Sequence, residues 1–581
     1  MNSLQKSLLG VEATYARAWR ALDRPRVLAH ALWLVPLAFG LLSLFLGQDD
    51  NWDLHNYHFY NPYALLNGKI GFDLAPGQWQ SYFNPTLDLL YYGLITHMPA
   101  PLAGFIMGVL HGLNFVLVLA VARQVLPAGA GVGNGSNNGA HRAALLLALA
   151  GTLAPGFLSE LGNTMGDNLT SLCVLGALLL LLRQWPHLSE GKARGAAMAL
   201  LAGLLMGVGA GLKLTNATYA LAQCLALFAL GGGLWSRLRM AFIYGVGVLA
   251  GIGISAGHWY WKMWIVFGNP LFPQFNDLFK GPLAAPIGIG DTGWIPKGIS
   301  EKLLWPFIFT LNPKRVIEIP MTQILWPMLY LAFVALALVG LRALVLARPP
   351  LPAQALAPRA RSPRTRFVLL FFALSYLGWL NLFGIYRYLV PLELLAPLAL
   401  WLVLHRLMPA PVARGVAAYG LLLAVLAIFP AHNWGHGAWA RSAFSADVPA
   451  FPQPEDSMVF TVHGDPPMGW LVPLFPNRLA FVALGSGFPE SQGYRDRVES
   501  MMASRRGPLY VMLQADRHDP AQQRAPEEQR QAQENKQLAL GRAQEILQRY
   551  ALALDPASCQ PHAAFVGRSR WTFQLCTVRR P

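Results

Sequence analysis

The chain is organised around residues 48–58, which read QDDNWDLHNYH. This stretch begins where the first long apolar run, residues 27–47, ends. It brings three carboxylates and two imidazoles together within ten residues: Asp49, Asp50, Asp53, His55 and His58. Charged groups at membrane depth are costly and are usually kept for a function. The stretch therefore predicts a functional loop just beyond the end of a first transmembrane helix.

The composition indicates a membrane protein. The chain has 581 residues, of which 54% are hydrophobic and only 13% are charged, whereas a typical soluble domain carries about 25% charged residues. The net charge of +16 does not indicate nucleic-acid binding, because residues 431–581 hold 16 basic and 14 acidic residues. The excess lies between the apolar runs, where we interpret it as a signal of membrane topology.

Eleven apolar runs are long enough to predict transmembrane helices. Lys and Arg are concentrated in alternate connections, which places residues 1–26 in the cytoplasm and, with an odd number of spans, residues 431–581 outside. The first run lacks a small-residue cleavage site and is interpreted as a signal anchor. We expect an integral protein of a bacterial-type inner membrane. The runs are 27–47, 101–124, 142–160, 168–184, 196–212, 216–234, 240–266, 322–346, 366–384, 388–406 and 412–430.

Two outer loops and a C-terminal domain accompany the transmembrane domain at 27–430. The first loop, residues 48–100, predicts a short helix that ends at Gly68 and a second from Pro85 to His97. The second loop is residues 267–321. Residues 431–581, the tail domain, predict an extracytoplasmic α/β domain with strands at 457–462, 478–484, 508–513 and 571–578 and a helix at 527–552.

Four cysteines fall into two pairs. Cys173 and Cys224 lie in apolar runs and are interpreted as core residues. Cys559 and Cys576 lie in the tail domain, and an oxidising compartment favours a disulfide between them.

Carboxylates supply the first candidates for chemistry. Asp53 stands at the start of a predicted helix, where it can act as an N-cap, but it can equally act as a general base toward a substrate hydroxyl. Asp50 is the reserve candidate for the base, and Asp49 competes for the same role. Asp167, after Gly166 in a short outer turn, either caps the next helix or holds an acceptor hydroxyl or a divalent cation.

Cations on the outer side of the membrane supply the second set of candidates for chemistry. Lys213 follows the run 196–212, and Arg387 precedes the run 388–406. Snorkelling to the interface is one explanation. Because cations are scarce on this side, binding of an anionic headgroup is the other, for which Arg offers a planar fork and Lys a point charge. Lys262 is a weaker candidate of the same type.

No nucleotide-binding loop and no paired Cys or His spacing typical of zinc occurs in the sequence. His58 and Tyr57 are candidates for substrate contact, since aromatic neighbours favour packing or sugar binding over metal ligation by His55 and His58. No cofactor is certain, although a divalent metal at Asp167 and Asp50 stays open.

At these residues the chain resembles the integral-membrane C-type glycosyltransferases, the GT-C superfamily. The resemblance covers residues 27–430. It rests on Asp53 after the first span with Tyr57 and Gly68 behind it, on Gly166-Asp167, on the stretch 211–215 that reads GLKLT, and on Arg387 in an RYLVP context.

The resemblance implies a polytopic helical enzyme that transfers a sugar from a polyprenyl-phosphate donor to a glycan, lipid or protein acceptor, with inversion at the anomeric carbon. In such an enzyme Asp53 takes the acceptor's proton, while Lys213 and Arg387 stabilise the leaving phosphate. A transporter or lipid flippase is the alternative, but we find no internal repeat, and the polar candidates gather at one face. We rank last the third hypothesis, a membrane-anchored protein that binds its ligand through the tail domain.

Overall fold

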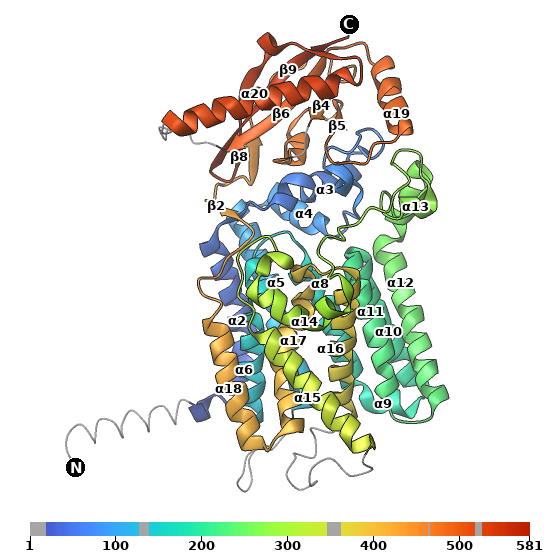
Figure 1. The fold of residues 1–581 in the computed structure, drawn as a ribbon, viewed down its shortest axis with the longest axis vertical. Coiled ribbons are helices and arrows are strands. Elements are labelled where there is room, and N and C mark those ends of the chain that lie inside the picture. Colours follow the sequence, from blue (N-terminus) through green and yellow to red (C-terminus); the bar gives the residue numbers. More distant parts are fainter. Residues whose placement is uncertain (1–18, 127–138, 346–361, 463–464, 518–525, 581) are drawn as a thin grey trace, which may run out of the picture.

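A computed structural model describes residues 19–126, 139–345, 362–462, 465–517 and 526–580. Long helices lie side by side in one half of the molecule, and a sheet with flanking helices forms the other half (Figure 1). The first loop lies between the two halves. The first described helix begins at the end of the bundle remote from the tail domain (Figure 1).

A helix occupies each of the eleven predicted runs within the described part of the chain. This confirms a polytopic helical protein with a C-terminal α/β domain. The helices are α2 (Pro25–Leu46), α5 (Ala100–Val125), α6 (Ala140–Thr152), α8 (Asp167–Arg183), α10 (Ala193–Leu212), α11 (Ala217–Ala226), α12 (Leu234–Phe267), α15 (Leu325–Val345), α16 (Pro363–Leu382), α17 (Val390–Leu407) and α18 (Ala410–Leu426).

Seven helical segments of the described chain are long and apolar enough to cross a membrane. The other four of the eleven helices, α6, α8, α11 and α18, are shorter than these segments. Pro155 ends the run 142–160 early by starting the separate short helix α7 (Pro155–Ser159). Lys213 and the turn Leu214–Asn216 delay the start of α11, and the glycines at 231–233 follow its end.

Glycines allow helices α10 and α12 to pack closely against each other. A Cβ at Gly207 of α10 would lie 2.1 Å from the Val248 carbonyl oxygen of α12, and one at Gly251 of α12 would lie 2.2 Å from the Leu204 carbonyl oxygen. Small residues let helix backbones approach in membrane proteins. The pair fixes the end of α10, where Lys213 follows.

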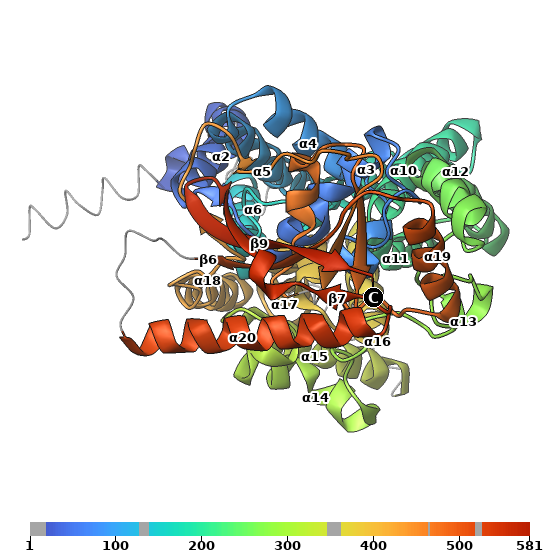
Figure 2. The same ribbon diagram turned by 90° about the horizontal axis from the view of Figure 1, so that it is seen from above.

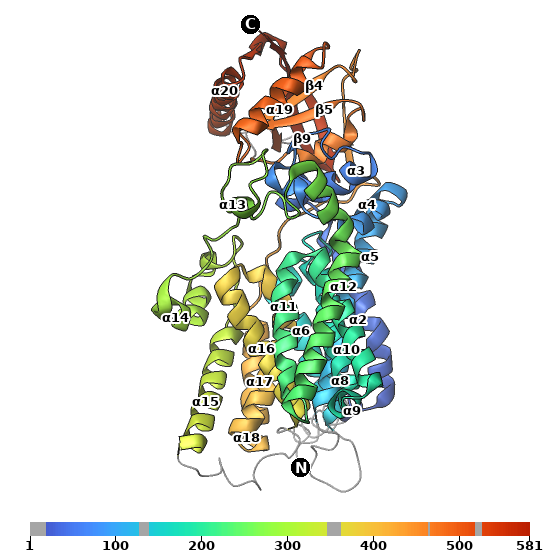
Figure 3. The ribbon, with the colours of Figure 1, turned by 90° about the vertical axis from the view of Figure 1, so that its right-hand side faces the viewer.

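The two loops contain the short helices that cover the end of the bundle. In the first loop, a π-helical turn (Leu54–His58) leads into α3 (Tyr60–Leu66), and α4 (Asp88–His97) follows. Gly68 lies beyond α3 with a left-handed φ of 67°, as predicted for a helix stop. The second loop holds α13 (Asn276–Phe279) and α14 (Gly298–Leu311). Figure 3 shows α13 beside the tail domain and α14 at the side of the bundle.

The tail domain is one mixed sheet with helices packed against it. Its strand order is β3-β8-β9-β6-β4-β5, with β7 paired to β9, and β4 runs parallel to both β5 and β6. Helix α20 (Pro526–Gln548) lies along the domain in the view from above (Figure 2). The strands are β3 (Phe444–Ala446), β4 (Met458–Val462), β5 (Ala480–Leu484), β6 (Leu509–Arg517), β7 (Ala553–Leu554), β8 (Gln560–Val566) and β9 (Ser569–Arg579).

The four predicted strands and the long helix are confirmed as β4, β5, β6, β9 and α20. Strand β8 and helix α19 (Gln492–Ala503) were not predicted. The predicted disulfide between Cys559 and Cys576 is present. It lies next to the paired residues Gln560 and Leu575, where adjacent antiparallel strands bring the two cysteines together.

The first loop is joined to the tail domain by backbone pairing and by a buried ion pair. Strand β1 (Gln48–Asp49) pairs antiparallel with β2 (His436–Gly437). Lys69 donates hydrogen bonds to the carbonyl oxygens of Asn477 (2.9 Å) and Leu479 (2.7 Å). Its partner Asp73, 3.2 Å away, accepts from the Phe481 N–H at 2.9 Å. The loop and the tail domain therefore form one packed unit above the helices.

Asp73 gives this unit a predicted pH dependence. Burial raises the pKa of the Asp73 carboxyl to about 6, although Lys69 favours its ionised form. Because an unfolded Asp titrates near about 3.9, protonation favours the folded state. This contribution to the free energy of unfolding is present below about pH 4 and is lost as the pH rises through about 6. Thermal unfolding at pH 5 and pH 8 should show a smaller pH difference in Asp73→Asn than in the wild type, and equal differences would contradict this assignment.

Candidate functional site

Two ion pairs meet at Met165, at the end of the bundle that faces the tail domain. Asp53 Oδ2 lies 2.6 Å from Arg387 Nη1, and Asp167 Oδ2 lies 2.6 Å from Lys213 Nζ. Lys213 also donates to the Met165 carbonyl oxygen at 2.7 Å, while Arg387 Nη1 contacts the Met165 sulfur. The structure thus brings together four of the residues that the sequence singled out, from four separate segments.

Both cations keep part of their surface open. The side chains of Arg387 and Lys213 are 19% and 18% exposed, whereas those of Asp53 and Asp167 are 11% and 5% exposed. The pair with Asp53 uses Nη1 of a guanidinium that has five N–H donors. Arg387 and Lys213 can therefore bind an anion while each stays paired with its carboxylate.

A buried carboxylate fixes the position of the Arg387 turn. Arg387 belongs to the 3-10 turn Tyr386–Leu389, and the Tyr386 hydroxyl donates to Glu393 Oε1 at 2.6 Å. Glu393 also accepts from the backbone N–H groups of Gly156 (3.1 Å) and Phe157 (3.0 Å). Glu393 thereby ties this turn to α7, just before the turn that carries Asp167.

The first loop is anchored at the end of α10, beside Lys213. Asn84 donates from Nδ2 to the carbonyl oxygens of Gly211 at 2.9 Å and Ser255 at 3.1 Å. Asp167 begins α8 behind Gly166, whose φ of 86° is left-handed. Gly166 holds the N-cap position, and the Asp167 side chain, at the first position inside the helix, is paired with Lys213. Capping is therefore not what holds this carboxylate.

The electrostatics of the site keep Asp53 ionised. Burial by itself would raise the pKa of Asp53, but Arg387, followed by His58 and Lys213, holds that pKa below its usual value. Asp53 makes no side-chain capping hydrogen bond at the turn that follows it. Asp53 is thus a buried, charged carboxylate beside two cations.

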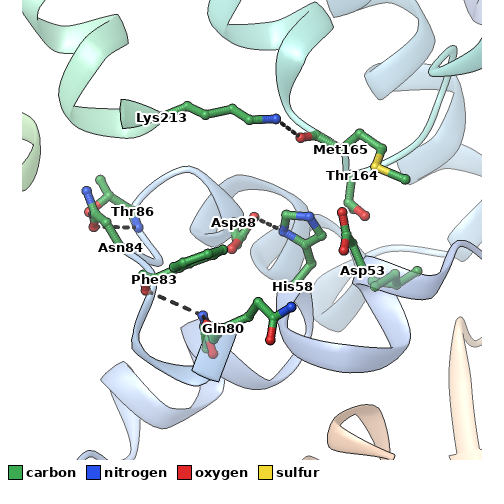
Figure 4. Close-up of polar contacts among 12 residues, drawn as sticks. Asp53, His58, Gln80, Phe83, Asn84, Thr86, Asp88, Thr164, Met165 and Lys213 are labelled. Atoms are coloured by element: carbon green, nitrogen blue, oxygen red, sulfur yellow. Dashed lines mark hydrogen bonds and ion pairs between the residues drawn. The ribbon is translucent and has the colours of Figure 1, made fainter. Parts of the chain in front are cut away.

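His58 and Tyr57 lie on the other side of Asp53. His58 Nδ1 is 2.7 Å from Asp88 Oδ1, and Figure 4 shows the imidazole between Asp88 and Asp53. The rings of Tyr57 and His58 lie 4.1 Å apart, and Phe83 meets Tyr57 edge-on at 5.4 Å. Burial and the Asp53 charge raise the pKa of Tyr57 well above its usual value, so its hydroxyl stays protonated.

The other acidic residues of the opening stretch have different partners. Asp49 accepts from the Thr164 N–H and hydroxyl, each at 2.8 Å, and so braces the turn before Asp167. Asp50 Oδ1 lies 2.7 Å from His55 Nε2. The His55 ring packs against Trp470 and Trp571 of the tail domain, at ring-centroid distances of 5.4 and 4.9 Å.

His55 and His58 do not lie on one helix face. The turn that contains them is π-helical, so residues three apart diverge. The His55 imidazole faces the tail domain, and the His58 imidazole faces the bundle.

Lys262, the weaker candidate for phosphate binding, lies apart from both ion pairs. No contact of the described residues joins Lys262 to either ion pair. Lys262 lies on α12, four residues after His258, which hydrogen-bonds Thr86 at 3.3 Å.

Among the described residues, no three His, Cys, Asp or Glu side chains are grouped as metal ligands would be. Asp50 and Asp167, the metal-ligand candidates, are engaged by His55 and Lys213 respectively.

Three charged residues near the site were missed. Asp88 begins α4, where a helix-terminal acid predicts only a favourable dipole interaction. Glu160 is fully buried, and its Oε2 accepts from the Asn168 N–H at 3.4 Å. Glu318, on the second loop, interacts electrostatically with Arg387 and Asp53. Glu160 ends an apolar run and Glu318 stands alone in its loop, so neither offered a sequence pattern.

The chain has little detectable similarity to known proteins. No known family model matches the chain, and no curated protein sequence is detectably similar to it. Among solved structures, an oligosaccharyltransferase from Archaeoglobus fulgidus, in complex with Zn and sulfate, is similar over 82% of this chain and 67% of its own, with 14% identity and a TM-score of 0.40. A similarity at this level carries no assignment of function, which rests instead on the contacts described above.

Proposed function

We propose that the protein is a membrane glycosyltransferase that moves a sugar from a polyprenyl-phosphate donor to an acceptor hydroxyl. The observation that supports this most is the meeting of the Asp53–Arg387 and Asp167–Lys213 pairs at Met165. A group-transfer site for such a donor needs cations for the phosphate and a carboxylate for the hydroxyl, side by side. It must also lie where a lipid can reach it, which is the end of an apolar bundle.

In the proposed reaction the acceptor oxygen attacks the anomeric carbon while the bond from that carbon to the phosphate oxygen breaks. Asp53 takes the proton of the acceptor hydroxyl. The electron pair of the broken bond leaves on the phosphate, whose charge Arg387 and Lys213 stabilise. A single displacement inverts the anomeric configuration. Tyr57 offers an aromatic wall to a sugar ring, and Asp167 holds Lys213 in place and is a candidate contact for the acceptor.

The placement of the polar residues favours an enzyme over a transporter. The two ion pairs lie where the first loop meets the end of α10 and the turn before α17, at one end of these helices. A transporter would be expected to place its binding site near the middle of the membrane, between broken helices. We further propose that this end faces the outside of the inner membrane, with residues 1–26 in the cytoplasm.

Label transfer tests the proposal. Purified protein in lipid vesicles is incubated with radiolabelled polyprenyl-phosphate hexoses and pentoses and with a lipid and glycan extract of cell envelopes. We expect at least one label to move to an acceptor. Lys262→Ala, outside both ion pairs, serves as the matched cation control and should transfer at nearly the wild-type rate. Failure of every donor to transfer label would contradict the proposed function.

A further inference from the structure

The His58–Asp88 pair is a buried polar pair of this region that the proposed chemistry does not use. Both residues are buried, with exposed fractions of 4% for His58 and 6% for Asp88. His58 Nδ1 lies 2.7 Å from Asp88 Oδ1. An ionised carboxylate can only accept a hydrogen bond, so Nδ1 donates to Asp88 and, in the neutral ring, Nε2 presents a lone pair. This pairing fixes both the tautomer and the ring orientation.

The second ring nitrogen has no partner among the described residues. His58 Nε2 is fully buried and makes no hydrogen bond there, although buried polar atoms are nearly always paired. Figure 4 shows the ring beside the Asp53 carboxylate, with Met165 and Lys213 across from it. The charged groups nearest to this ring include Asp53, Asp88, Arg387 and Lys213, and Asp167 and Glu318 act on the same two cations or on Asp53. At this position, the unpaired His58 Nε2 can take up a proton that is released during the reaction.

Asp53 alone is a poor final acceptor for that proton. Its carboxylate is already bound to Arg387 at 2.6 Å, and that contact favours the ionised form. A neutral imidazole with a free Nε2 is a stronger base near neutral pH than a carboxylate paired with a guanidinium. The Asp88 carboxylate would stabilise the imidazolium that forms.

We propose that His58 is a second catalytic residue, which receives the acceptor's proton from Asp53, and that Asp88 positions it. The proton moves from the acceptor hydroxyl to Asp53. No hydrogen bond joins His58 Nε2 to Asp53 in this structure, so the protonated carboxyl turns from Arg387 toward the ring, passes the proton to Nε2 and then returns to its charged pair with Arg387. The imidazolium later releases the proton to solvent. This inference rests on the proposed function, because the proton comes from the acceptor of glycosyl transfer.

His55 provides a matched control. It too pairs with an aspartate, Asp50, at 2.7 Å, but its ring packs against Trp470 and Trp571. The test compares His58→Ala, His58→Gln, Asp88→Asn and His55→Gln in the label-transfer assay with the radiolabelled polyprenyl-phosphate panel. Thermal unfolding verifies that each variant is folded. His58→Ala and His58→Gln should lose about 10²-fold or more in rate, Asp88→Asn should lose less, and His55→Gln should stay near the wild type.

Added imidazoles separate proton transfer from packing. Imidazole should restore part of the rate of His58→Ala, and 4-methylimidazole, which is more basic, should restore more than 1,2,4-triazole, which is less basic. Rescue that is equal for all three compounds would show a space-filling role and would overturn the proposal. A wild-type rate in His58→Gln would overturn it as well. Absence of transfer by the wild type would instead overturn the proposed function, and this role with it.

Discussion

Replacing Arg387 by alanine should reduce glycosyl transfer by about 10²-fold or more, because a preorganised donor to the departing charge is lost. The same change leaves Asp53 buried without its partner at 2.6 Å. Arg387→Lys should recover only part of the rate, since an ammonium group lacks the planar fork that binds phosphate through two N–H groups. Initial rates of label transfer at saturating donor measure both variants.

The alanine variant needs a control for folding, because removing one member of a buried pair destabilises a protein by about 3–5 kcal/mol. Arg315→Ala removes an arginine from a half-exposed pair with Glu301 on the second loop and is the matched comparison. Its expected cost in stability is small, and its transfer rate should be nearly normal. Full activity in a folded Arg387→Ala protein would remove Arg387 from the reacting centre.

Replacing Asp53 by asparagine should lower turnover by about 10²–10⁴-fold, the range typical of a lost general base. Asparagine keeps the shape of the side chain and can still accept a hydrogen bond from Arg387 Nη1. It cannot take a proton at neutral pH. The variant should therefore fold and bind the lipid donor while transfer fails.

Donor binding and turnover must be measured separately for this variant. Retention of a radiolabelled polyprenyl-phosphate sugar on the immobilised protein reports binding, and product formation reports transfer. Loss of both together would point to a scaffold role for the Asp53–Arg387 pair. Retained binding with lost transfer is the expected result.

Much of the fold follows from the sequence because apolar runs and strand patterns are local signals. The eleven runs and the strands β4, β5, β6 and β9 were predictable in this way. The disulfide of the tail domain was predictable from an isolated pair of cysteines in a domain expected on the outer side of the membrane. Helix length was less predictable, since Pro155 divides one apolar run into two helices. The pairing of β1 with β2 joins residues 48–49 to 436–437, and no local pattern of two residues predicts such a partner.

The site was predictable as a set of residues but not as a set of contacts. Charge on an apolar background singled out Asp53, Asp167, Lys213 and Arg387. The partner of each did not follow, because Asp53 and Arg387 are 334 positions apart. Asp88 escaped notice because an acid in the first turn of a helix has an ordinary explanation.

The comparison of Asp53→Asn with Asp50→Asn tests the central claim most directly. Both aspartates belong to the same stretch and both are held by a cationic or imidazole partner, at 2.6 Å and 2.7 Å respectively. Only Asp53 lies at the two cations proposed to hold the phosphate. In one vesicle preparation with radiolabelled polyprenyl-phosphate sugar, Asp53→Asn should transfer label about 10²-fold more slowly than the wild type, and Asp50→Asn should lose much less. Normal transfer by Asp53→Asn, or a loss confined to Asp50→Asn, would contradict the account.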